Sequence, residues 1–180
     1  MLQIIIPSVE LWDEHNQVFL RTRETKLQLE HSLVSIAKWE SKWNKPFLTN
    51  KKKTYKEAID YIRCMTMTQN VKPEIYNLLT ESNISDIEEY INAPMTATTF
   101  SEEENKKKNR DVITAEIIYW WTISLNIPIE FQKWHLNRLL TLIRVCNIKN
   151  QPPKKMNKRE VFRRNSELNK ARRRQLNSKG

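Results

Sequence analysis

The stretch Asp111–Ile148, DVITAEIIYWWTISLNIPIEFQKWHLNRLLTLIRVCNI, decides the expected fold because it contains two apolar segments joined at Asn126-Ile127-Pro128. Between Asp111 and Glu130 the only charged residue is Glu116, and a helix that is apolar nearly all round is expected to be buried. Asp111 is a candidate N-cap for this helix. One helical face combines Ile113, Ile117, Trp120, Trp121 and Ser124, and Ile118, Ile123 and Leu125 cover much of the rest.

The second apolar segment begins at Pro128, which disfavours helix at Ile127 and suits the first turn of a following helix. Its apolar side chains recur at the 3.6-residue spacing of one helix face. They are Leu136, Leu139, Leu140, Ile143 and Cys146. The two segments together predict a helical hairpin that supplies most of the core.

The N-terminal part of the chain has the patterns of short strands. Leu2–Ile6 is a strand candidate ended by Pro7, and Val18–Leu20 is another. Between Lys26 and Leu33 polar and apolar residues alternate, which is the period of a half-buried strand. These three segments predict a small antiparallel β element within about residues 1–34.

Helical signals follow this β element. The capping box Thr54-x-x-Glu57 opens a helix that is expected to run to about Thr68. The expected fold is therefore mainly α: a helical bundle around the central apolar hairpin, with the small β element at the N-terminus. Other short helices are predicted with Ile36, Trp39 and Trp43 on one face, at Glu74–Leu79 behind Pro73, and at Ser85–Ile91.

The charge of the chain is concentrated at its C-terminal end. Residues 154–180 hold eleven Lys or Arg and two Glu, which is +9 of the total net charge of +10 and leaves +1 for the body, residues 1–153. Asn157, with Glu160 three residues further on, is a candidate start for a last helix. A lone helix of this length is marginal in water, so we expect a basic, partly disordered or helical arm that becomes ordered on a partner.

The glycine count excludes several classes of enzyme. The chain has one glycine, Gly180, its last residue. It therefore has no Gly-rich phosphate loop, no Rossmann fingerprint and no nucleophile elbow. The segment LQIIIP at the N-terminus lacks a basic region and is too short for a signal peptide, and we expect no membrane span.

The residues that carry chemistry show no recognisable site. The cysteines, Cys64 and Cys146, are expected to be buried thiols in a reducing compartment. The histidines, His15, His31 and His135, have no ligand spacing, so we expect no metal, no cofactor and no catalytic residue. Glu116 is interpreted as one half of a buried ion pair, with Arg138 or Arg144 as candidate partners.

Tryptophans and arm cations are the candidate binding residues. Six tryptophans in 180 residues is a high number, and helical spacing favours core packing for them over a binding groove. The basic arm suits either a protein surface of opposite charge or the phosphates of a nucleic acid. The partner-binding candidates are Trp39, Trp43, Trp134, Lys154, Lys155, Arg159, Arg163, Arg164, Arg172, Arg173 and Arg174.

Four segments carry a resemblance to a known family. They are HSLVSIAKWESKWNKPFL at residues 31–48, PMTATTF at 94–100, ITAEIIYWWTISLNIPIEFQKWHLNRLLTLIRVCN at 113–147 and PPKKMNKREVFRRNSELNKARRRQLNSKG at 152–180. Together they resemble small proteins of long-tailed bacteriophages (siphophages), usually described as tail assembly chaperones or left without an assigned role. The resemblance covers most of the chain and rests on these stretches of similar sequence, not on a catalytic motif.

The resemblance implies a non-enzymatic assembly factor in the cytoplasm of an infected bacterium. Proteins of that kind coat the long helical tape-measure protein, keep it soluble and recruit tail-tube subunits. They are typically absent from the finished particle, and some exist in a short and a frameshift-extended form. The family offers no catalytic residues to transfer to this sequence.

Three other hypotheses stay open on the sequence. The first is a nucleic-acid-binding protein that acts through residues 154–179 and loses affinity steeply with salt. The second is a minor structural protein of the virion. The third is an enzyme, which would need Cys64 with a depressed pKa beside a histidine.

Overall fold

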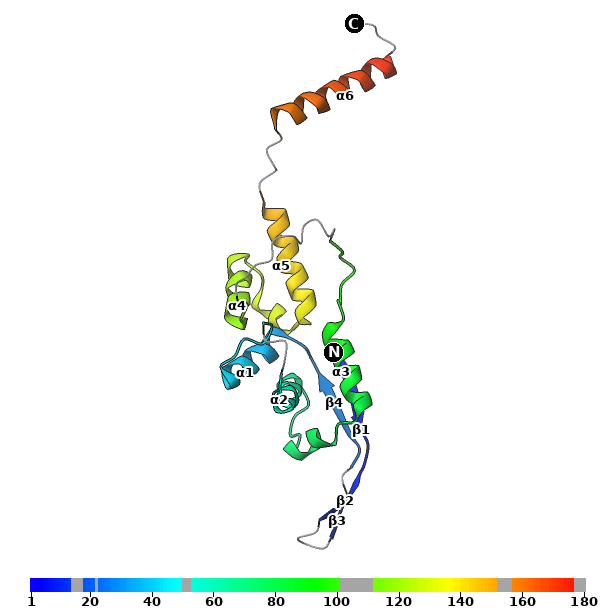
Figure 1. Cartoon of the computed structure of the whole chain (residues 1–180), viewed down its shortest axis with the longest axis vertical. Helices are drawn as coiled ribbons and strands as arrows, with labels where there is room; N and C mark the ends of the chain where they lie inside the picture. Colours follow the sequence, from blue (N-terminus) through cyan, green and yellow to red (C-terminus); the bar gives the residue numbers. More distant parts are fainter. Residues whose placement is uncertain (14–17, 22, 50–52, 101–111, 152–156, 177–180) are drawn as a thin grey trace. The chain divides into compact units, whose positions relative to one another are not determined.

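The computed structural model describes residues 1–13, 18–21, 23–49, 53–100, 112–151 and 157–176. Two antiparallel β-ladders lie at its N-terminal end (Figure 1). In the first, β1 (Leu2–Ile6) pairs with β4 (Thr25–Leu29). In the second, β2 (Glu10–Asp13) pairs with β3 (Val18–Arg21). The prediction of a small N-terminal antiparallel sheet is confirmed, but the strand at 18–20 pairs with β2 and does not join β1 and β4.

The inner face of the β1–β4 ladder follows the two-residue period of a strand. Ile4 lies opposite Leu27, and both are buried, as are Ile6 and Leu29, while Lys26 is exposed. The strand predicted from Lys26 ends at Leu29, before the predicted limit. It ends there because Ser32 is the N-cap of the helix that follows.

Helix α1 (Leu33–Trp43) starts from a reciprocal capping box. The Ser35 backbone N–H donates to Ser32 Oγ at 3.3 Å, and the Ser32 N–H donates to Ser35 Oγ at 3.0 Å. The helix ends at Asn44, which has a left-handed φ of 52°. The Asn44 N–H donates a hydrogen bond to the Glu40 carbonyl. Its apolar positions Leu33, Ile36 and Trp39 are fully buried.

Helix α2 (Tyr55–Met65) begins at the predicted capping box of Thr54 and Glu57. It ends at Met65, three residues before the predicted end, because the following backbone pairs with the edge of β4. The Glu30 N–H donates to the Met65 carbonyl at 2.9 Å, and the Met67 N–H donates to the Gln28 carbonyl at 2.8 Å. Helices α1 and α2 pack against each other, as Figure 1 shows.

The next two elements are short. The 3-10 helix η1 (Pro73–Leu78) has Pro73 at its first position, as predicted. Helix α3 (Glu81–Asn92) begins four residues before the predicted start because Thr80 and Asn83 form another capping box. It packs on β1, where Asn83 Nδ2 donates to the Ile5 carbonyl at 3.3 Å.

Residues 112–148, the described part of the apolar stretch with which the sequence analysis began, contain three elements. Helix α4 (Ala115–Ser124) has Thr114 as its N-cap, so it starts later than the predicted cap at Asp111. After Pro128 the chain forms the 3-10 helix η3 (Ile129–Lys133), and helix α5 (Leu136–Asn150) follows. The predicted stripe of α5 is confirmed at Leu136, Leu139 and Ile143, which are buried.

The core has a different centre from the predicted one. Helix α1 packs against α2, α4 and η3, so it is α1 that joins the elements of the body. The expectation that the hairpin supplies most of the core is wrong, because strands and earlier helices contribute more of the buried apolar side chains. Those outside the hairpin are Ile4, Ile6, Leu27, Leu29, Leu33, Ile36, Trp39, Phe47, Tyr61, Ile62, Met65, Tyr76, Ile87 and Tyr90, and those inside it are Ala115, Ile118, Leu136, Leu139 and Ile143.

The chain divides into two compact units, Met1–Asn147 and Ile148–Gly180. The second unit contains helix α6 (Lys158–Leu176), which starts directly after Asn157 as predicted. The Val161 N–H donates to the Asn157 carbonyl at 3.0 Å. None of the helices within the described ranges is long and apolar enough to cross a membrane.

Candidate functional site

The surface of α4 and η3 exposes large apolar side chains. Trp120 is 63% exposed, Ile123 is 70% exposed and Ile129 is 53% exposed. Trp120 and Ile123 are three residues apart and therefore lie on the same face of α4. Tyr119 Oη donates to Gln132 Oε1 at 2.8 Å, and this bond ties α4 to the η3 segment that carries Ile129. We call Trp120, Ile123 and Ile129 the α4 patch.

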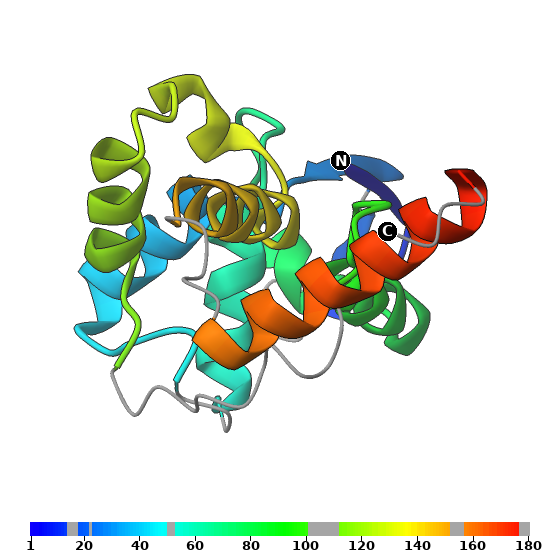
Figure 2. The ribbon, with the colours of Figure 1, turned by 90° about the horizontal axis from the view of Figure 1, so that it is seen from above.

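The opposite face of α4 anchors it to the body. Ala115, Ile118 and Thr122 are the buried residues of α4, and the helix packs on α1, as Figures 1 and 2 show. The sequence placed Trp120 on one broad apolar face, but a helix that is apolar nearly all round has no pattern to choose its inner side. The tertiary contact with α1 makes that choice and leaves the Trp120 side in solvent.

A buried carboxylate of α1 fixes the start of α4. Glu40 Oε2 accepts the Ala115 N–H at 2.7 Å, and Glu40 Oε1 accepts the Phe47 N–H at 2.6 Å. Glu40 is 7% exposed, so both bonds form away from water. Because a helix N-terminus favours negative charge, the bond from Glu40 to Ala115 holds the start of α4, while the bond to Phe47 holds the segment that follows α1.

Glu116 is exposed, and the interpretation of a buried ion pair is wrong. The two proposed partners contact aromatic rings: the Arg138 guanidinium lies 4.1 Å from the centroid of Trp134, and that of Arg144 lies 3.9 Å from the centroid of Phe100. Glu116 lies one turn before Trp120 on the same side of α4, and Glu130 is exposed beside Ile129. The α4 patch is therefore flanked by negative charge.

The three tryptophans predicted as binding residues have different surroundings. Trp39 is fully buried, and its Nε1 donates to the Glu57 carbonyl at 2.9 Å. It is therefore a core residue, and the prediction that it binds a partner is wrong. Trp43 is half-buried, stacks on Trp39 and donates from Nε1 to Asp60 at 2.9 Å. Trp134 is half-buried between the Phe131 ring, 4.0 Å away between centroids, and Arg138.

The basic arm forms an exposed helix over its described part. Between residues 158 and 176 there are eight Lys or Arg and two Glu. Glu167 lies 3.7 Å from the Arg163 guanidinium, and because both side chains are exposed this ion pair contributes little to stability. Arg159, Arg163, Arg164, Arg172, Arg173 and Arg174 are all exposed, whereas Lys154 and Lys155 lie outside the described residues.

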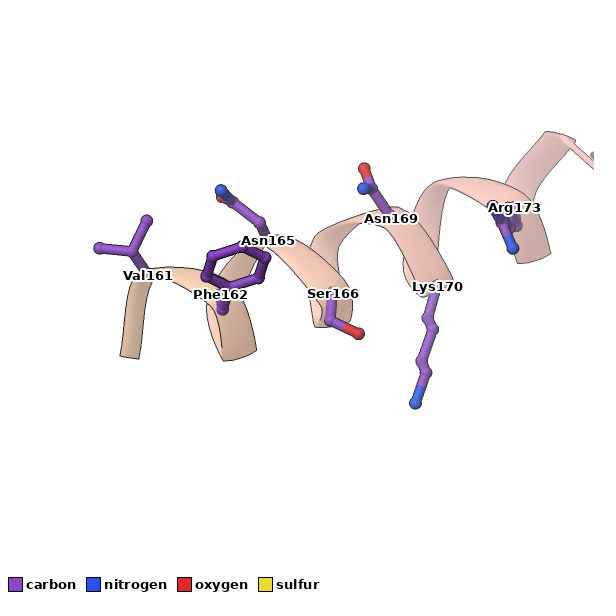
Figure 3. A pocket seen from close by; sticks show the side chains of 7 residues that line it. All are labelled: Val161, Phe162, Asn165, Ser166, Asn169, Lys170 and Arg173. Atoms are coloured by element: carbon purple, nitrogen blue, oxygen red, sulfur yellow. The ribbon is translucent and has the colours of Figure 1, made fainter. Parts of the chain in front are cut away.

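Apolar side chains of α6 are exposed as well. Phe162 is 78% exposed, and Val161, Leu168 and Leu176 are also in solvent. A hollow of about 410 Å³ follows the helix, and all seven side chains that line it belong to α6 itself, as Figure 3 shows. A hollow with walls from one helix does not enclose a small molecule.

Two histidines that are far apart in sequence meet in the body. The ring centroids of His31 and His135 are 5.0 Å apart, and both side chains are buried. His31 Nδ1 is hydrogen-bonded to Tyr61 Oη, and His135 Nε2 is 3.0 Å from the Tyr90 carbonyl. Burial lowers the pKa of His31 to about 3, and it lowers the pKa of His135 too.

No sequence pattern predicts this histidine pair, because a separation of 104 residues follows no local period. It joins the end of β4 to α5, where the Leu136 N–H also donates to the His31 carbonyl at 2.7 Å. Held neutral and hydrogen-bonded, the pair serves packing. Within the described ranges no group of three or more His, Cys, Asp or Glu is placed to hold a metal ion.

The cysteine considered for nucleophilic chemistry has the wrong environment for it. Burial raises the pKa of the Cys64 thiol, and the nearby Asp60 carboxylate acts in the same direction. A nucleophilic cysteine needs the opposite shift, because the thiolate is the reactive form.

Comparison with protein-family models, with curated protein sequences and with solved structures gave no significant match.

Proposed function

We propose that the protein is a non-enzymatic assembly chaperone of a bacteriophage tail, which binds the tape-measure protein or tail-tube subunits in the cytoplasm of the infected host. The observation that carries this proposal is the α4 patch, with Trp120, Ile123 and Ile129 in solvent on an anchored helix. The resemblance of the sequence to tail assembly chaperones gives the partner.

The α4 patch suits a helical partner. Exposed apolar residues rimmed by polar ones mark protein interaction sites, and tryptophan is a frequent energetic anchor in them. A tape-measure protein is a long array of amphipathic helices, and such a helix binds by laying its apolar stripe on an apolar surface. Glu116 and Glu130 beside the patch would favour a partner stripe bordered by Lys or Arg.

The test is co-expression of this chain with the tape-measure protein of the same phage. We expect the soluble fraction of the tape-measure protein to rise with the wild-type chain and to return to its unaided level with Trp120→Glu/Ile123→Glu. Met67→Glu is the matched control, because Met67 is also an exposed apolar residue but lies outside the patch. Equal solubility with and without the chain would count against the proposal.

A second candidate, nucleic-acid binding through the arm, is favoured by the exposed cations of α6. Phosphate contacts predict an affinity for DNA that falls steeply with salt and is lost on truncation at Gln151. An arm that binds protein predicts little affinity for DNA at physiological salt. A third role, as a minor structural protein of the virion, predicts that mass spectrometry finds the chain in purified particles.

A further inference from the structure

Helices α1 and α2 separate their charges between the interior and the surface. Their carboxylates, Glu40, Glu57 and Asp60, are all buried. Their cations are exposed, and these are Lys38, Lys42, Lys56 and Arg63. The body has a net charge of only +1 in sequence, yet this pair of helices presents a cationic face because its carboxylates are buried and its cations are exposed.

Each buried carboxylate already has its own partners within the fold. Glu57 accepts hydrogen bonds from Lys45 Nζ and from the Thr54 N–H, each at 2.7 Å, and these lower the pKa of Glu57 to about 2. Burial raises the pKa of Asp60, but hydrogen bonds from Lys42 and Trp43 outweigh it and the pKa is lowered. Both groups stay ionised and hydrogen-bonded, and the charge of Asp60 also interacts with that of Arg63.

A groove of about 370 Å³ lies on this cationic face. Tyr55 stands at its rim and is 69% exposed, with no hydrogen bond or ring contact to the described part of the chain. Lys56 has no ion pair within the described residues, and the Arg63 guanidinium lies 5.3 Å from the Tyr76 ring centroid. The groove is also lined by Asp60, which is buried and forms an ion pair with Lys42, so Lys56 and Arg63 are the cations left for a ligand. The other side chains that line it are Trp43, Ile59 and Asn77.

We propose that this groove binds a segment of single-stranded nucleic acid. Lys56 and Arg63 contact the phosphates, one base stacks on the exposed ring of Tyr55, and the Asn77 amide supplies a donor and an acceptor for a base edge. An acidic peptide would use the cations but has no need of an open aromatic ring. The combination of exposed cations with an exposed ring therefore favours a nucleic acid without sequence preference.

The experiment measures fluorescence anisotropy of a labelled short oligothymidylate titrated with the full chain at several salt concentrations. Every variant carries Arg172→Gln, Arg173→Gln and Arg174→Gln, so that α6 contributes less to binding. In this background we expect Tyr55→Ala to weaken binding by about five-fold or more. Lys56→Gln/Arg63→Gln should reduce the slope of log affinity against log salt by about 1.4, since each lost phosphate contact removes about 0.7.

The matched control is Lys26→Gln/Lys149→Gln, which removes the same charge from exposed positions outside the groove. Far-UV circular dichroism checks that each variant is folded, and Tyr55→Phe should keep most of the affinity because it keeps the ring. Two outcomes overturn the proposal. One is an unchanged affinity and salt slope in the groove variants; the other is equal displacement by polyglutamate together with no effect of Tyr55→Ala.

Discussion

Helices α1 and α4 are neighbours of similar length, 11 and 10 residues, but their side chains are used in opposite ways. The more polar helix, α1, buries Leu33, Ile36 and Trp39 and a glutamate besides. The more apolar helix, α4, leaves Trp120 and Ile123 in solvent. The comparison teaches that the place of a helix in the fold, and not its hydrophobicity, decides how much of it is buried. Apolar residues that the fold leaves exposed to solvent, such as those of α4, are candidates for contact with a partner.

The strongest test of the comparison replaces one tryptophan in each helix. Trp39→Ala should lower the free energy of unfolding by about 3–5 kcal/mol, because it removes a fully buried aromatic side chain and leaves a cavity. Trp120→Ala should change it by no more than about 0.5 kcal/mol, since that ring is in solvent. Urea unfolding followed by circular dichroism measures both. Equal losses in the two variants would show that α4 is buried on both sides.

The second test concerns the carboxylate that joins the two helices. Glu40→Ala should lower the free energy of unfolding by about 3 kcal/mol, because the buried N–H groups of Phe47 and Ala115 lose their acceptor. Glu116→Ala, the control in the first turn of α4, should cost about 0.5 kcal/mol or less. A Glu40→Ala variant as stable as the wild type would mean that packing alone positions α4.

The third test uses pH and the histidines beside α1. The folded-state pKa of His31 is about 3, below its unfolded value of 6.5, so below pH 6.5 the unfolded state binds more protons than the folded state. The free energy of unfolding should therefore be at its full value above pH 6.5 and fall as the pH drops. His31 alone contributes a loss of about 2 kcal/mol between pH 8 and pH 5.

Unfolding curves at a series of pH values measure this loss. In His31→Gln the free energy of unfolding at pH 8 should be lower than in the wild type, but its decline between pH 6.5 and pH 5 should be shallower. A variant with the same decline as the wild type would assign the acid sensitivity to other groups.

The smallest expected effect is spectroscopic. Trp120→Phe should reduce the quenching of the remaining tryptophan fluorescence by acrylamide, because it removes an exposed indole. Trp39→Phe should increase the average quenching, because it removes a protected one. Both substitutions keep an aromatic ring, so the comparison does not depend on a large loss of stability. The reverse order of quenching would place Trp120 inside and Trp39 outside.

Local signals of the sequence predicted the elements well. The capping box of Thr54 and Glu57 opens α2, Pro73 opens η1, and the short apolar segment before Pro7 forms β1, because each signal depends on residues that lie close together in the chain. The ends of elements were less accurate. Helix α2 stops at Met65 because its backbone then pairs with β4, and a local pattern holds no information about that distant strand.

The candidate binding surfaces were also predicted only in part. Composition predicted the exposed cations of the arm, since a run of charged residues is exposed wherever it lies. Trp39 was among the candidate binding residues as well, but it is buried. Helical spacing names the residues that share a face, and it does not say which face meets the body. For α4 that decision comes from α1, through the Glu40 carboxylate.

The sequence by itself determined that this is a mainly helical protein with a small N-terminal antiparallel sheet and a separate basic segment at its end. Only the tertiary structure decided that Trp120 and Ile123 face solvent, that His31 meets His135, and that the carboxylates of α1 and α2 are buried. The physical reason is range: caps, strand alternation and charge runs act between near neighbours, whereas burial depends on which distant segments pack together.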